Sequence, residues 1–190
     1  MRVNAYQALK PSSFLSCEKD AETIIKKLFV LSGEHSEDLK RLLVVNTEDC
    51  LDNPDKKYTN KMKDYTVKKL MEEKYITLVP RIKLKEHENL KSYIVISFDD
   101  FVPTSNPQYR DCEIHFDILC HTDYWQLTDY QLRPFKIMGI IDTILDNTKL
   151  SGIGTLQFLR STELMVSDEL AGYSITYLAT HGSDDSIEGE

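Results

Sequence analysis

Residues 109–121 alternate between apolar and polar side chains more regularly than any other part of the chain. Successive side chains of a strand point to opposite faces of a sheet, so this segment is predicted to be a strand with one core face and one polar face. The core face carries Cys112, Ile114, Phe116, Ile118 and Cys120, and the other face carries Asp111, Glu113, His115, Asp117, Leu119 and His121. Such a strand is stable only inside a sheet whose apolar face is covered, which indicates a globular domain.

The rest of the chain divides into helical and extended patterns. Apolar residues at helical spacing predict helices over 18–32, 36–43 and 134–147, and the Lys-rich stretch 60–74 is also predicted to be a helix. Alternation predicts strands over 76–84, interrupted by Pro80, and over 92–101, 156–166 and 173–179. The order of these elements predicts an α+β fold, with an antiparallel (mixed) sheet of about five strands and helices packed on one face.

The length of 190 residues suits a single domain. We expect residues 1–182 to form one α+β domain, in which 1–15 are an N-terminal arm and 34–74 are a helical insertion. Residues 183–190 are expected to be an acidic flexible tail. The chain has no apolar run long enough for a transmembrane helix and no signal-peptide core, so no membrane partner is predicted.

The net charge of −8 is distributed unevenly along the chain. Residues 54–91 hold 11 basic and 6 acidic side chains, whereas residues 92–130 hold 1 and 7. A protein that grips a duplex by its phosphates is usually basic overall, so nucleic-acid binding is disfavoured as the main function. Patches of opposite charge suit head-to-tail self-association, although solvated faces produce the same pattern.

Two clusters in the predicted central strand resemble sites for chemistry. Cys112 and Cys120 are eight residues apart, roughly 26 Å along a strand, and they face away from His115 and His121, so they cannot share one zinc ion. Glu113, His115 and Asp117 lie on one face, where they would bind a metal or perform acid–base chemistry. A strand face exposed to water gives the same pattern without chemistry, and we favour that alternative. No cofactor is predicted.

Trp125 and the Lys-rich stretch are candidate contact residues. Trp125 is the only tryptophan and lies in a loop beside other aromatic residues, where it would anchor a helix to the sheet or form an interface hot spot. Lys61 and Lys68 belong to the stretch 60–74, which would serve as a recognition surface if the protein were a soluble adaptor.

Three segments of the C-terminal half resemble neck proteins of tailed bacteriophages, in particular the tail-terminator or tail-completion group. They are FDILCHTDYWQLTDYQLRPFKIMGIIDTILDN (Phe116–Asn147), KLSGIGTLQF (Lys149–Phe158) and LAGYSITY (Leu170–Tyr177). In that group a strand ends in an aromatic loop, an L-R-P-type helix follows, and the next strand begins with a G-x-G turn. The resemblance covers roughly residues 110–180.

This resemblance implies a tail-terminator-like α+β subunit that closes into a ring at the head–tail junction and is not an enzyme. Its implied partners are copies of itself and other virion proteins such as the connector and tail tube, and its implied location is the virion, assembled in the host cytoplasm. The candidate interface or channel-facing residues are then Glu113, His115, Asp117, Trp125, Lys61 and Lys68. DNA would pass the acidic strand face without being held. The alternatives are a small metal-dependent or acid–base enzyme using Glu113, His115 and Asp117, or a soluble adaptor.

Overall fold

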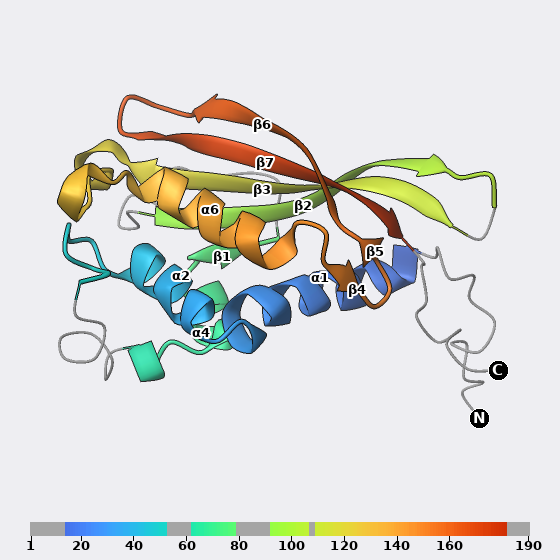
Figure 1. Cartoon of the computed structure of the whole chain (residues 1–190), viewed down its shortest axis with the longest axis horizontal. Coiled ribbons are helices and arrows are strands. Elements are labelled where there is room, and N and C mark those ends of the chain that lie inside the picture. The colour runs from blue at the N-terminus through green and yellow to red at the C-terminus, as the bar shows by residue number, and fades with distance from the viewer. Residues whose placement is uncertain (1–13, 53–61, 79–91, 107–108, 182–190) are drawn as a thin grey trace.

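The computed structural model describes residues 14–52, 62–78, 92–106 and 109–181, and shows one sheet with helices on one of its faces (Figure 1). The helices are α1 (Cys17–Lys26), α2 (Glu34–Val44), α4 (Val67–Glu72) and α6 (Arg133–Leu145). The strands of the main sheet are β1 (Ile76–Thr77), β2 (Ser92–Pro103), β3 (Arg110–His121), β6 (Gln157–Met165) and β7 (Leu170–His181), and β4 (Lys149–Leu150) pairs with β5 (Gly154–Thr155) in a small second sheet. The α+β class expected from the sequence is confirmed.

The main sheet has the strand order β1-β2-β3-β7-β6. Strand β1 is parallel to β2, and every other neighbouring pair is antiparallel, so the sheet is mixed as expected. Strand β3 lies at the centre, where Phe116 is opposite Ile96 on β2 and Ile175 on β7. The strands at the two edges are the short β1 and the longer β6.

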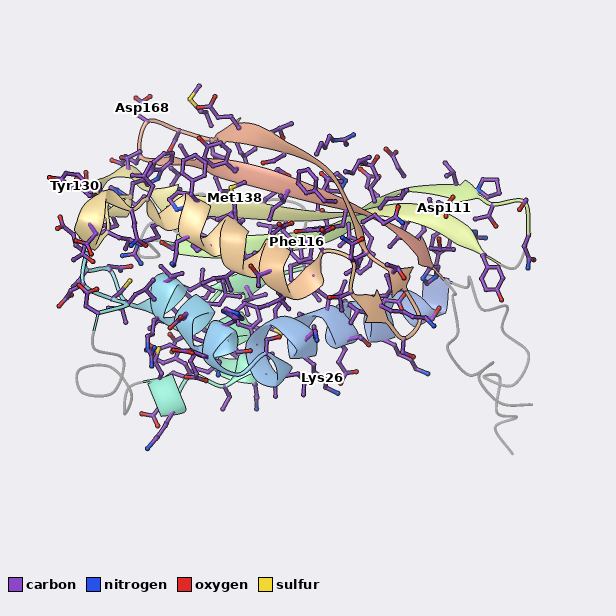
Figure 2. The ribbon with its side chains drawn as sticks, in the orientation of Figure 1. Lys26, Asp111, Phe116, Tyr130, Met138 and Asp168 are labelled. Atoms are coloured by element: carbon purple, nitrogen blue, oxygen red, sulfur yellow. The ribbon has the colours of Figure 1, made fainter. Side chains whose placement is uncertain are left out.

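The core lies between this sheet and the helices α1, α2 and α6 (Figure 1). The five residues predicted for the core face of β3 are all buried there, and Phe116 lies between the strands and the helical layer (Figure 2). The Tyr177 hydroxyl on β7 donates a 2.7 Å hydrogen bond to Asp142 on α6, which ties this helix to the sheet. The alternation in the sequence therefore identified the correct buried face.

The helices near the N-terminus differ from expectation in detail. The helix predicted over 18–32 is α-helical to Lys26 and then π-helical over Lys27–Leu31. The continuous helix predicted over 60–74 is wrong, because α4 begins only at Val67. Thr66 is extended, and its hydroxyl accepts a hydrogen bond from the Lys69 amide, so it is the N-cap that starts α4.

Several expectations fall outside the described residues. They concern residues 1–13 of the N-terminal arm, Lys61, the acidic tail 183–190, and the continuation of the first strand over 79–84. In the part of the chain that the structure describes, no helix is long and apolar enough to cross a membrane.

Candidate functional site

The polar face of β3 carries an ion-pair network built by three strands. Glu113 Oε2 lies 2.7 Å from the Arg160 guanidinium on β6 and 3.5 Å from His115 Nε2. His115 Nδ1 forms a 3.1 Å hydrogen bond with the hydroxyl of Thr176 on β7. Asp117 lies one row further along, opposite Val95 and Ser174. Arg160 thus neutralises the carboxylate that the sequence offered for metal or acid–base chemistry.

The same face becomes apolar toward the end of β3. Tyr93, Val95, Leu119 and Leu170 form a second buried cluster on the side of the sheet away from the main core. Leu119 is the one apolar residue among the odd positions of β3, and it is opposite Tyr93 on β2. This face therefore combines an ion-pair network with a small apolar cluster.

Trp125 is half-buried and anchors the loop that follows β3. Its indole nitrogen donates a 3.1 Å hydrogen bond to the carbonyl oxygen of Cys120, and its ring lies beside that of Tyr173. The Trp125 carbonyl accepts a 2.6 Å hydrogen bond from the amide of Arg133, the first residue of α6. The structure thus shows the helix-to-sheet anchor that was one of the two alternatives for this residue.

Of the two candidate contact residues in the Lys-rich stretch, Lys68 is the one that lies in the described part of the chain. It projects from α4 with a highly exposed side chain and lies 3.7 Å from Glu72, one helical turn later. An exposed pair of this kind adds little to stability. Lys68 is therefore available for contact with another molecule.

Strand β6 is an exposed edge that the sequence did not single out. Every one of its nine residues is exposed except Leu164, which is half-buried. Three of the exposed side chains are large and apolar: Met165 is 77% exposed, Phe158 50% and Leu159 43%. Phe135 on α6 is 49% exposed as well. The exposed apolar side chains Phe135, Phe158, Leu159 and Met165 are therefore candidates for a protein contact.

A second cluster joins the start of α1 to the end of β7. The Sγ atom of Cys17 lies 3.8 Å from His181 Nε2, and His181 Nδ1 lies 2.5 Å from Asp20 Oδ2. Asp20 and His181 are buried, whereas Cys17 is half-buried. Burial raises the pKa of the Cys17 thiol, and the neighbouring Asp20 carboxylate raises it further. Sequence spacing alone does not reveal this cluster, because its members come from opposite ends of the described chain.

Comparison with known proteins gives a family match and a distant structural likeness. The likeness is to a chain of the virion of a native gene transfer agent (GTA) particle, with 15% identity, coverage of 65% of this chain and 90% of that chain, and a TM-score of 0.39. A TM-score of that size does not establish a shared fold, so nothing about this chain follows from it. No curated protein matches. The model of the YomW family matches residues 36–179, and the chain therefore belongs to the YomW family, whose phage origin agrees with the resemblance in the C-terminal half.

Proposed function

We propose that this protein is a virion structural protein of a tailed bacteriophage, a ring-forming subunit at the head–tail junction that joins head and tail. It acts as a tail-terminator, tail-completion or connector ring, is assembled in the host cytoplasm, and has no catalytic role. Membership of a phage-derived family supports the phage setting of this proposal. The exposed edge strand β6 supports the assembly role.

The exposure of β6 at the edge of the sheet is the observation that best supports the proposal. Natural proteins protect sheet edges with short strands, inward-pointing charges or covering segments, because an open edge pairs with other chains. Strand β6 has nine residues, pairs on one side with β7, and exposes Phe158 and Leu159 near its start and Met165 at its end. An edge of this kind is stable in solution when another subunit covers it.

A ring requires two different surfaces on each subunit, because the contact in a closed ring is head-to-tail. The edge of the sheet opposite β6 is β1, which contacts α4 (Figure 1). Helix α4 carries the exposed Lys68. We place the β6 edge of one subunit against the β1–α4 side of the next. Glu163 on β6 and Lys68 on α4 are both exposed and carry opposite charges, which favours this orientation. Lys61 lies outside the described residues, so its role stays a prediction from the sequence.

The polar face of the sheet is proposed to look toward the passage for DNA. Asp99, Asp111, Glu113 and Asp117 lie on this face. Carboxylates repel the phosphate backbone and so let DNA move without adhering. Glu113→Gln removes one negative charge from this wall and leaves Arg160 without its carboxylate, whereas Asp117→Lys replaces a negative charge by a positive one. The same ion pair weakens the enzyme alternative, since it occupies the carboxylate that catalysis would need.

The mass of the assembled protein and its presence in particles test the proposal. Native mass spectrometry of the purified chain, alone and with tail and connector proteins of the same phage, is expected to show a closed oligomer of hexamer size or larger. Peptide mass spectrometry of purified virions is expected to detect the chain at a few copies per particle. A chain that stays monomeric with those partners and is missing from virions would contradict the proposed function.

A further inference from the structure

The buried Cys17, Asp20 and His181 cluster has the residue types and placement of a metal site. Cys17 is the first residue of α1, Asp20 lies one turn later, and His181 is the last residue of β7. Each side chain offers one ligand atom: a thiol sulfur, a carboxylate oxygen or an imidazole nitrogen. These three atoms all lie within 4.8 Å of one another. It is the one such group of three or more among the residues that the structure describes.

Two of the three side chains are almost completely withdrawn from water. The exposed fraction is 2% for Asp20 and 1% for His181, and the Phe101 ring lies edge-on against the His181 imidazole at 5.6 Å. A carboxylate is rarely buried unless a cation or several hydrogen bonds compensate it. The buried Asp20 carboxylate contacts the imidazole of His181, and a bound metal ion would add a further positive charge beside it.

The three groups match the ligand preferences of one class of metal ion. Zinc binds thiolate, imidazole and carboxylate ligands together, and a thiolate with a carboxylate balances its two positive charges. Bonds of about 2.3 Å to sulfur and about 2.0 Å to nitrogen hold the ligand atoms of a tetrahedral zinc about 3.5 Å apart. The 3.8 Å between Cys17 Sγ and His181 Nε2 is close to that separation. Asp20 contacts the other ring nitrogen, Nδ1, so its carboxylate must turn toward the Cys17 side to reach the same ion.

We propose that Cys17, Asp20 and His181 bind one divalent transition-metal ion of the zinc class. Binding releases the thiol proton, because the ligand is the thiolate. Cys17 is half-buried and lines a pocket of about 280 Å³ with Leu78, Ile96 and Phe98, which gives an ion a route to the thiol. The ion links the first turn of α1 to the end of β7, so it stabilises the fold. This proposal is independent of the ring assembly.

Cobalt and zinc titrations of the full-length protein test the site. The purified chain is stripped of metal and titrated with Co²⁺, and the thiolate-to-cobalt absorption band in the near ultraviolet is recorded. We expect the band to saturate at equimolar Co²⁺, and Zn²⁺ to displace the cobalt and raise the melting temperature. Cys17→Ser and Asp20→Asn, which preserve side-chain size, are expected to weaken binding by about 100-fold or more, since loss of mere outer-shell contacts already costs up to that factor.

His115→Gln is the matched control, because His115 also lies beside a carboxylate but has no thiol within its network. This variant is expected to bind Co²⁺ like the wild type. Circular dichroism of each variant separates loss of binding from loss of fold, and Cys17→Ser remains informative because Ser is well tolerated at the start of a helix. Absence of the thiolate band in the wild type, or its persistence in Cys17→Ser, would overturn the proposal. Rapid alkylation of Cys17 without metal binding would identify a His-activated thiol instead, and would overturn it as well.

Discussion

The guanidinium of Arg133 donates a 2.6 Å hydrogen bond to the carbonyl oxygen of Leu42. It also donates to the carbonyl oxygens of Val45 and Thr47, at and beyond the end of α2, and to that of Tyr124 in the loop after β3. Arg133 itself is fully buried. One side chain therefore satisfies carbonyls at a helix end, which lack partners inside the helix, and fixes α2 to the start of α6.

Replacing Arg133 by Met is expected to lower the free energy of unfolding by about 3–5 kcal/mol. Met fills much of the space, but it leaves four carbonyl oxygens without their donor, of which those of Leu42 and Val45 are in buried hydrogen bonds. Hydrogen bonds to charged groups are the stronger ones. Urea denaturation followed by circular dichroism measures the change. Arg160→Met is the control, because Arg160 is half-exposed in a surface ion pair and its loss is expected to cost less than about 1 kcal/mol. Equal losses in the two variants would refute the buried role of Arg133.

Gly172 on β7 has no space for a side chain. A Cβ atom at this position would lie 1.9 Å from the carbonyl oxygen of Ile118 on β3, which is backbone and cannot rotate away. Gly172→Ala is therefore expected to destabilise the protein by about 3 kcal/mol. Gly139 on α6 provides a matched test, since a Cβ there meets nothing within 4 Å. Gly139→Ala is expected to stabilise the helix by about 0.5–1 kcal/mol, and thermal melts of the two variants should move in opposite directions.

Tyr93 is expected to make the fold sensitive to alkaline pH. Burial raises its pKa from 10.0 to about 12 in the folded state. Below pH 10 the phenol is neutral in both the folded and the unfolded chain, so the full free energy of unfolding is present. Between about pH 10 and 12 only the unfolded phenol ionises, which lowers the free energy of unfolding. At about pH 11 the expected loss is about 1 kcal/mol relative to pH 8. Denaturant unfolding at the two pH values measures it.

Tyr93→Phe removes the titrating hydroxyl, so the difference in unfolding free energy between pH 8 and pH 11 is expected to shrink by that amount. Tyr130 is 94% exposed and stands at the outer end of the loop before α6 (Figure 2), so Tyr130→Phe is the control. An unchanged pH dependence in Tyr93→Phe would show that other groups govern the alkaline transition.

The central sheet was predictable because β3 obeys a simple rule. Its even residues must fill the space under α1, α2 and α6, and its odd residues face away from that core, so the burial pattern is visible in the sequence. The break before α4 was not predictable from spacing, because Thr66 sits within a helical pattern. Only the hydrogen bond from the Lys69 amide to its hydroxyl reveals that Thr66 is a cap.

The side-chain clusters were less predictable because they depend on the register of the strands and on contacts between residues far apart in the sequence. Arg160 reaches Glu113 because a bulge between Phe158 and Arg160 sets Arg160 opposite Thr176, which is itself opposite His115. Asp20 and His181 are separated by 161 positions in the chain, and their contact requires the last strand to end beside the first helix. No local pattern carries such information.

The apolar edge of β6 is expected to control oligomeric state. Leu159→Lys combined with Met165→Lys places two charges on this edge, where their desolvation in a subunit contact is unfavourable. Both side chains are solvent-exposed in the subunit, so its own unfolding free energy is expected to change by no more than about 0.5 kcal/mol, while the oligomer dissociates. Val102→Lys, on an exposed residue of β2 away from that edge, is expected to retain the oligomer. Light scattering after size-exclusion chromatography distinguishes these outcomes, and an intact oligomer in the double β6 variant would exclude this edge as the ring contact.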